Sequence, residues 1–358
     1  MRYGILGSGQ LAWMLSLAAQ KLGHEVVMLS GSDSRLEGFD FISFESEFTD
    51  FNVWGESLKN APVYPSVDVM KQLSDKWEQK SLFAKFQIPT AKASLYESSQ
   101  CPSDREVVAK WARLGYDGYG NLVMSKNSQG LEQRWETFSK KAKEQNSRIY
   151  LEEKIPFEAE AALVVARDKN GLLLRYPLVL TEQSESVCNW VWGPASAKSP
   201  EMQLKVDELW PKLEGFLNSL NYVGVMAFEF FWVDGKLLLN EVAPRVHNSG
   251  HITIDAFNFS QFDLHLLAPL GFGDIQIQAK SPYYAMKNLL GKELQELQAN
   301  TFIKSISREL SLYWYGKKEI RKGRKMGHFN CLFNEKSRES IRAELQKEEE
   351  QLWQKLKK

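Results

Sequence analysis

The chain has 358 residues, a length that predicts two or three domains, each large enough to bury its own core. Its 45 lysines and arginines balance 45 aspartates and glutamates, so the formal net charge is zero. This balance excludes a uniformly basic surface, and with it a general affinity for nucleic acid or anionic lipid, although it leaves room for a local basic patch.

The hydrophobic residues, 43% of the chain, are spread as in a globular protein. The most apolar stretch, 222–233, contains Glu229 and is far shorter than the ~20 residues that cross a bilayer, so we expect no membrane partner. The first residues form a glycine-rich turn where a signal peptide would be apolar, and the three cysteines are isolated. These features predict a cytoplasmic protein without a zinc site or a nucleic-acid partner.

The N-terminal residues predict a βαβ unit with a glycine turn. A short apolar strand at 3–6 precedes Gly-Ser-Gly at 7–9, apolar residues then recur at helical spacing over 11–22, and a second strand follows at 25–29. Ligands of open α/β sheets bind at such a turn, where the helix N-terminus offers N–H groups. We expect a phosphate or phosphorylated ligand there. A structural turn is the alternative, and NAD is disfavoured because the second strand does not end in an acidic residue.

A glycine-rich segment at 115–120 follows a helix predicted around 69–86. It is flanked by strands at 106–110 and 122–124 and lacks the Lys-Ser/Thr of a Walker loop. It is either a lid over phosphates, with Lys110 supplying charge, or an ordinary β-turn. Further strands are predicted at 149–152, 160–166 and 172–180.

Glu229 and Glu241 lie in two apolar strands, 223–233 and 236–242, which Asp-Gly joins as a hairpin. A three-residue loop would place Glu229 opposite Glu241, whereas a strict two-residue turn would place Asn240 there. Ionised carboxylates are costly to bury without compensation. Two carboxylates on one face suit Mg²⁺, which leaves room for nucleotide phosphates; salt bridges to lysine or arginine are the alternative.

The loop that follows, 243–251, is rich in hydrogen-bond donors. Arg245 offers a planar fork to an oxyanion such as bicarbonate or phosphate, and His247, Asn248 and His251 can donate to the same ligand or exchange protons with it. A purely structural loop is the alternative.

Six basic residues occupy nine positions from Lys317 to Lys325, as either a solvated loop or a phosphate clamp. The charged tail, 335–358, is predicted to form a helix that packs on the body of the protein. Its apolar contacts are Ile341, Leu345, Leu352 and Leu356.

These motifs, in this order, resemble the N5-carboxyaminoimidazole ribonucleotide synthetases of the ATP-grasp superfamily. The most specific stretch runs from Asn240 to His251, and the likeness extends from the first glycine turn to 323–328. It implies an α/β (α+β) ATP-grasp fold in three domains. These are a Rossmann-like βαβ domain at 1–75, an ATP-grasp domain at 76–275 with a lid at about 105–155, and a small β-rich C-terminal domain at 276–358 with the terminal helix.

The resemblance implies an ATP-dependent carbon–nitrogen ligase that carboxylates 5-aminoimidazole ribonucleotide in purine biosynthesis, with bicarbonate activated as carboxyphosphate. Its metal would be Mg²⁺ or Mn²⁺, and its state a homodimer. By position, Lys76, Lys110, Glu152, Ile155 and Glu160 would bind ATP, Glu229 and Glu241 the metal, and Arg245, His247 and Asn248 bicarbonate, while Gln10, Glu45, Tyr116, Asp117, Lys318 and Arg324 would bind the ribonucleotide.

Some positions differ from the family's usual pattern. Trp13 stands where an arginine is common, Tyr119 where a lysine or arginine is, 181–183 where Asn-x-His is, and Leu267 where an arginine is. Two alternatives follow: a diverged ATP-grasp carboxylate–amine ligase that uses a different amine, or a non-catalytic nucleotide- or phosphoribosyl-binding relative. The two hairpin carboxylates and the arginine after them favour an enzyme.

Overall fold

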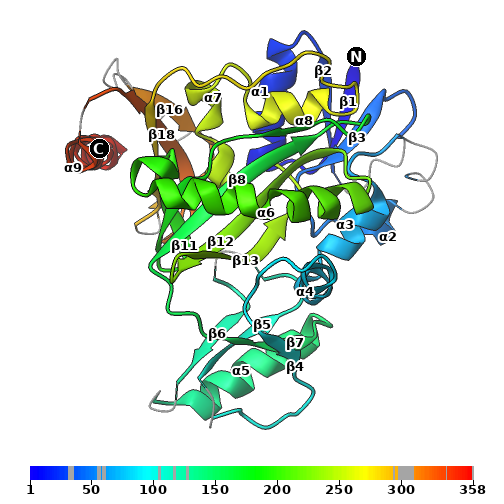
Figure 1. Ribbon diagram of the computed structural model, residues 1–358, viewed down its shortest axis with the longest axis vertical. Coiled ribbons are helices and arrows are strands. Elements are labelled where there is room, and N and C mark those ends of the chain that lie inside the picture. The colour runs from blue at the N-terminus through cyan, green and yellow to red at the C-terminus, as the bar shows by residue number, and fades with distance from the viewer. Residues whose placement is uncertain are drawn as a thin grey trace.

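The computed structural model describes residues 1–30, 36–54, 58, 62–103, 106–115, 118–125, 129–292, 295–296, 310–335 and 337–356. Figure 1 shows a central sheet, with the N-terminal strands at the upper right and a small sheet at the bottom. No helix among these residues is long and apolar enough to span a membrane.

The N-terminal unit confirms the predicted βαβ order. β1 (Arg2–Leu6), α1 (Gln10–Lys21), β2 (Glu25–Leu29) and β3 (Phe41–Phe44) follow one another, and the three strands pair in parallel in the order β2-β1-β3. The glycine turn therefore lies at the carboxyl end of the central strand of this sheet. A short helix, α2 (Phe51–Trp54), follows.

The single helix expected around 69–86 is two helices, α3 (Val67–Leu73) and α4 (Lys76–Lys85). The carboxylate of Asp75 accepts hydrogen bonds from the N–H groups of Trp77 and Glu78, which is the geometry of an N-cap and begins a new helix there. Helical periodicity alone does not reveal such a break.

The lid is a four-stranded antiparallel sheet covered by one helix. Its strands, in the order β4-β7-β5-β6, are β4 (Ala93–Leu95), β7 (Ile149–Glu153), β5 (Val107–Trp111) and β6 (Asn121–Met124), and its helix is α5 (Leu131–Glu144). Figure 1 shows it at the bottom, below α4. A small core that includes Trp111 and Trp135 holds α5 on the strands.

The central sheet has the order β13-β12-β8-β10-β11-β14-β18-β16, with β9 paired to β8. Its strands are β8 (Ala159–Arg167), β9 (Leu173–Arg175), β10 (Val179–Ser184), β11 (Val187–Gly193), β12 (Gly224–Val233), β13 (Lys236–Ala243), β14 (Tyr283–Leu290), β16 (Leu310–Trp314) and β18 (Lys325–Phe333). Because β11 pairs with β14, the strands of the expected C-terminal domain continue the sheet of the ATP-grasp domain. The three-domain division stays a prediction.

Two cores lie on opposite faces of this sheet. One is covered by α6 (Pro200–Ser219), which crosses the sheet in Figure 1, and by α9 (Arg338–Leu356). The other is covered by α1, α7 (Thr253–Ala256) and α8 (Gln261–Leu267). The four apolar residues predicted to fix the terminal helix, Ile341, Leu345, Leu352 and Leu356, are all buried in the first core.

A candidate active site between the lid and the central sheet

The hairpin of β12 and β13 has a two-residue turn and nevertheless places Glu229 opposite Glu241. Asp234 and Gly235 both have positive φ, 47° and 69°, as a tight hairpin turn requires. The register then runs regularly until Phe230 faces Leu239, and the next pair is Glu229 with Glu241. Asn240 is therefore the extra residue of a β-bulge.

This bulge decides which face Glu241 occupies. Leu237 and Leu239 belong to the core under α6, and regular alternation would send Glu241 into the same core. The extra residue reverses the alternation, so that Ala243 packs in the opposite core with Ala227. Glu241 and its partner across the hairpin consequently share the face that looks toward α1 and α8.

A third carboxylate, Glu160, lies on this face of β8. Its neighbour two residues on, Ala162, pairs with Glu229. Burial, together with the negative charges of Glu229 and Glu241, raises the pKa of Glu160 to about 7. The negative charges of Glu229 and Glu241 therefore act on Glu160 as well.

The donor set fits a hard divalent cation that shares its ligands with a substrate. Carboxylate oxygens are what Mg²⁺ prefers, and the site needs only one or two of them when phosphates supply the rest. Among the described residues no three His, Cys, Asp or Glu side chains form an all-protein metal cage. The opposed pair Glu229 and Glu241 suits the shared arrangement.

Basic side chains now contact these two carboxylates. Lys76, at the start of α4, forms an ion pair with Glu241, and Nε2 of His247 lies 2.9 Å from Glu229. Burial alone would raise the pKa of Glu241, but Lys76 and Lys110 outweigh it and hold that pKa below its usual value. The expected alternative of salt bridges is thus present in this structure, at the same residues as the expected metal site.

Glu152 of β7, expected to bind ATP, lies between two lysines. It forms ion pairs with Lys110 of β5 and Lys80 of α4, and all three side chains are buried. Burial would raise the pKa of Glu152, yet the two ammonium groups hold it below its usual value. Lys80 was not predicted. The sequence could have indicated Lys80, because it lies four residues after Lys76 and a helix places both lysines on one face.

Arg245 is bound by a carboxylate from the N-terminal unit. Its Nε and Nη2 both donate to Glu47, the latter at 3.1 Å, and Nη1 donates to the carbonyl of Val246 at 3.1 Å. Burial would raise the pKa of Glu47, and Arg245 holds it below its usual value. Glu47 was missed, although it lies two residues after the predicted Glu45. The two-pronged contact is the geometry with which a guanidinium binds a planar oxyanion.

His247 and Asn248 follow in the same loop with defined hydrogen bonds. The N–H of Ser249 donates to Nδ1 of His247 at 3.3 Å, so a neutral imidazole carries its proton on Nε2, toward Glu229. The amide of Asn248 pairs with that of Asn288 at 2.8 and 3.0 Å. Gln261 ties the loop down by hydrogen bonds to the N–H and carbonyl of His247.

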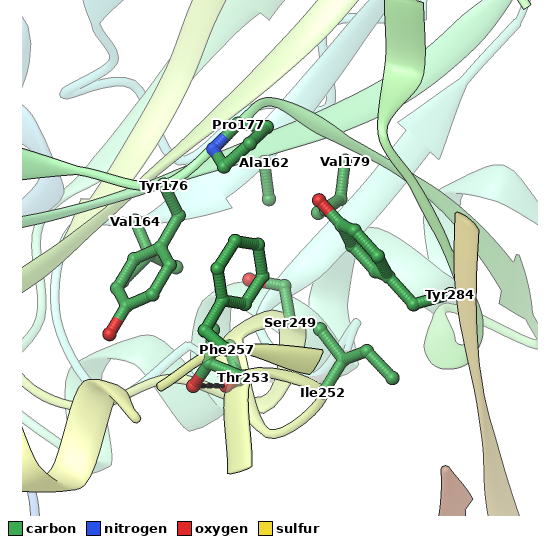
Figure 2. A pocket seen from close by; sticks show the side chains of 11 residues that line it. Ala162, Val164, Tyr176, Pro177, Val179, Ser249, Ile252, Thr253, Phe257 and Tyr284 are labelled. Atoms are coloured by element: carbon green, nitrogen blue, oxygen red, sulfur yellow. Dashed lines mark hydrogen bonds between the residues drawn. The ribbon is translucent and has the colours of Figure 1, made fainter. Parts of the chain in front are cut away.

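A small cavity lies between this loop and the strands β8 and β10, and Figure 2 shows the side chains that line it. Its volume is about 10 Å³, room for roughly one water. Ser249 and Gly250 line it from the loop and Ala162 from β8, and the hydroxyl of Tyr284 has no hydrogen-bond partner among the described residues. The cavity is therefore too small for a nucleotide.

Glu45 occupies the glycine turn. Its carboxylate accepts from the N–H of Gly9 at 2.7 Å and from that of Leu11 at 3.0 Å. A Cβ on Gly7 or Gly9 would lie 2.3 or 2.4 Å from the Glu45 oxygens, which explains both glycines by steric exclusion. Two of the donors that we expected a phosphate to use are therefore taken by Glu45 in this structure.

The basic segment 317–325 meets the glycine turn through Lys317. Its Nζ lies 3.2 Å from the side-chain oxygen of Gln10, whose nitrogen is 3.3 Å from Nε2 of His251. The predicted Lys318 is exposed, and Arg324 donates to the carbonyl of Glu319 at 2.9 Å. The sequence predicted that Lys318 would lie at this site, whereas the structure places Lys317 next to Gln10. Tyr116 and Asp117 lie outside the described residues.

The positions that differ from the family pattern have structural contacts of their own. Trp13 packs edge-on against Tyr315, and Tyr119 packs edge-on against Trp111 in the lid. Glu182 forms ion pairs with Arg338 and Arg342 of α9. Glu182, which differs from the family pattern, therefore binds the terminal helix to the central sheet.

The fold and this site define an ATP-grasp protein. The sequence model of the ATP-grasp domain family matches residues 79–262, and that of the phosphoribosylaminoimidazole carboxylase C-terminal domain matches residues 285–343. A solved carboxyaminoimidazole ribonucleotide synthase from Aspergillus clavatus, complexed with ATP, superimposes with a TM-score of 0.81 at 26% identity, with 98% of each chain covered. The structure of the Aspergillus clavatus synthase with ADP and 5-aminoimidazole ribonucleotide gives 0.79 at 26% identity, again with 98% of each chain covered.

Relatives named as synthases narrow the class further. The N5-carboxyaminoimidazole ribonucleotide synthase of Synechococcus elongatus is 33% identical over 91% of this chain and 88% of its own length. That of Vibrio cholerae is 31% identical over 92% and 90%. The chain belongs to the family of N5-carboxyaminoimidazole ribonucleotide synthases, which confirms the resemblance seen in the sequence.

Proposed function

We propose that this chain carboxylates 5-aminoimidazole ribonucleotide with ATP and bicarbonate, as an ATP-dependent carbon–nitrogen ligase of purine biosynthesis. The single observation that carries the proposal is the opposed pair Glu229 and Glu241, which the bulge at Asn240 places on one face, with Arg245 in the loop directly after β13 and bound in the planar-oxyanion geometry. A metal–phosphate site next to an oxyanion site is what the activation of bicarbonate by ATP needs.

ATP would bind between the lid and the central sheet, using Lys76, Lys110, Glu152, Ile155 and Glu160. The phosphates would replace carboxylates as partners of Lys76 and Lys110, and this exchange frees Glu241 to bind Mg²⁺ or Mn²⁺. Such a cation, when bound, neutralises the charge that builds on the transferred phosphoryl group. Neither lysine would then be left without an anion.

Bicarbonate would be held by Arg245, His247 and Asn248. One of its oxygens attacks the γ-phosphorus of ATP, the bond to the β,γ-bridging oxygen breaks, and ADP leaves. The product is carboxyphosphate. Arg245 would exchange Glu47 for this ligand, and Nε2–H of His247 can donate to it once it turns from Glu229.

The ribonucleotide would bind at the glycine turn, with Gln10, Glu45, Tyr116, Asp117, Lys318 and Arg324, and we add Lys317 to this set. Its exocyclic amine attacks the carboxyl carbon of carboxyphosphate, the carbon–oxygen bond to phosphate breaks, and the departing phosphate takes up the proton that the amine loses. The closed lid keeps water from hydrolysing the intermediate. A homodimeric state and a cytoplasmic location are proposals that rest on the family likeness alone.

The test is the release of ADP by the purified protein with Mg²⁺, with and without bicarbonate and 5-aminoimidazole ribonucleotide. We expect the rate to require bicarbonate and to rise several-fold with the ribonucleotide. A rate that ignores the ribonucleotide but rises with another amine would favour the diverged ligase, for which the exchange of arginine for Trp13 is the specific observation. ATP binding without turnover would favour the non-catalytic relative.

A further inference from the structure

The side chain of Asn288, in β14, is wholly buried and pairs with the proposed bicarbonate ligand Asn248. Its amide nitrogen also donates to the backbone carbonyl of Cys188 at 3.0 Å. Because a carbonyl only accepts, this bond sets which end of the Asn288 amide is nitrogen. The orientation of the Asn288 amide is therefore fixed by the sheet, not by the loop.

The fixed amide in turn fixes Asn248. The oxygen of Asn288 can accept only from the nitrogen of Asn248, at 3.0 Å, and its nitrogen donates to the oxygen of Asn248, at 2.8 Å. One N–H of Asn248 is used in this pair, and the other has no partner among the described residues. Asn248 is thereby held as a donor with one N–H available to a ligand.

The opposite face of β14 carries an ion pair with the terminal helix. Lys287 precedes Asn288 and, by the alternation of a strand, points the other way. Its ammonium lies 3.1 Å from Glu349 of α9 and donates to Asn189 at 2.6 Å and to the carbonyl of Asn288 at 2.8 Å. Only 5% of the Lys287 side chain and 11% of that of Glu349 are exposed.

This lysine needs its partner in the helix. A buried ammonium is costly without an anion, and burial lowers the pKa of Lys287 although Glu349 opposes that change. The hydrogen bond to the carbonyl of Asn288 links the ion pair to the backbone that carries the fixed amide. The terminal helix, for which the sequence suggested only packing, thus contacts the strand next to the residue that pairs with Asn248.

We propose that Asn288 is a positioning residue that sets the orientation of Asn248 for bicarbonate, and that Glu349 of α9 maintains it through Lys287. The proposal rests on the proposed function, because bicarbonate is the ligand that Asn248 would orient. It adds a role for β14 and α9, neither of which contacts the substrates in our assignment.

The test measures kcat and KM for bicarbonate, ATP and the ribonucleotide in wild type, Asn248→Ala, Asn288→Ala and the double variant. We expect Asn288→Ala to lower kcat/KM for bicarbonate about tenfold to a hundredfold, because a misplaced Asn248 would no longer hold bicarbonate in the reactive geometry. We expect KM for the ribonucleotide to stay unchanged. We expect the double variant to be no worse than Asn248→Ala, because Asn288 acts through Asn248.

Independent effects that multiply in the double variant overturn the proposal, as does a loss confined to thermal stability. Should Asn288→Ala fail to fold, Glu349→Gln decides, with Glu350→Gln, exposed on the same helix, as its control. We expect Glu349→Gln alone to raise KM for bicarbonate several-fold; equal values for the two variants overturn the proposal. A wild type whose ADP release ignores bicarbonate overturns the proposed function itself, and the two failures are thus distinct.

Discussion

Asn240, the extra residue of the hairpin bulge, accepts a hydrogen bond of 2.9 Å from Lys110 of the lid. One residue therefore turns Glu241 toward the site and also anchors the lysine that would bind the phosphates of ATP. Bulges commonly re-aim side chains next to active sites, and here the inserted residue has a contact of its own. The lid and the metal-binding hairpin are coupled at this point.

Asn240→Ala is expected to keep the bulge, because the backbone register does not depend on the side chain, and to release Lys110 from one partner. We predict that KM for ATP rises about threefold to tenfold, because one charge-assisted hydrogen bond to Lys110 is lost. We expect kcat to change little. Steady-state kinetics at saturating bicarbonate provide the measurement. Asn170→Ala, in the exposed turn after β8, is the control, and a wild-type KM for ATP in Asn240→Ala would mean that this contact does not matter for the nucleotide.

Glu241→Gln is expected to remove the metal-binding carboxylate while preserving the shape of the hairpin. We predict that kcat/KM for ATP falls by at least about a hundredfold. The reason is that the metal, which would neutralise the charge on the transferred phosphoryl group, loses one of its two carboxylate ligands. Circular dichroism should show a folded protein. Glu153→Gln, an exposed carboxylate at the end of β7, is the matched control. Turnover like that of wild type would refute the assignment of Glu241 to the metal.

Most of the fold could be predicted because its elements are marked locally. The βαβ unit, the Asp-Gly hairpin and the apolar positions of α9 each follow from periodicity and turn residues that lie within one short window. The break between α3 and α4 was missed because helical periodicity continues across it; the available signal was Asp75, an N-cap residue three positions before Glu78. The continuation of the sheet from β11 to β14 depends on pairing between residues about 100 apart.

The candidate site was predictable by residue type but not by contact. With regular strands, a two-residue turn would place Asn240 opposite Glu229, and opposed carboxylates would need a three-residue loop. The bulge at Asn240 allows a two-residue turn and opposed carboxylates together. Lys80 and Glu47 were missed because each is defined by a partner far away in the sequence, Glu152 and Arg245 respectively. No spacing rule connects such pairs.

Gly9→Ala tests the steric explanation of the glycine turn. The new Cβ would lie 2.4 Å from Glu45, so the carboxylate must move and its bonds to the N–H groups of the turn are lost. We expect the free energy of unfolding to fall by about 1–3 kcal/mol and KM for the ribonucleotide to rise. Gly215→Ala, in α6 with ordinary contacts at 3.7 Å, should be neutral or slightly stabilising. Equal stability of the two variants in urea would contradict this explanation.

The raised pKa of Glu160 predicts a specific dependence of stability on pH. The folded protein keeps this proton up to about pH 7, whereas the unfolded chain releases it near the usual value of 4.5, so the folded state binds more protons between these values. The contribution of Glu160 to the free energy of unfolding must therefore decrease as pH rises from 4.5 to 7 and stay low above that range.

Glu160→Gln removes this titration. We expect the variant to gain about 1–3 kcal/mol relative to wild type between pH 5 and pH 8, measured by urea unfolding without nucleotide or metal. Glu153→Gln should show no such pH-dependent difference. Because the negative charges of Glu229 and Glu241 contribute to the shift, Glu229→Gln should recover part of the gain even with Glu160 intact. Parallel pH profiles for wild type and Glu160→Gln would show that the three carboxylates are not coupled, and would remove the electrostatic support for a cation among them.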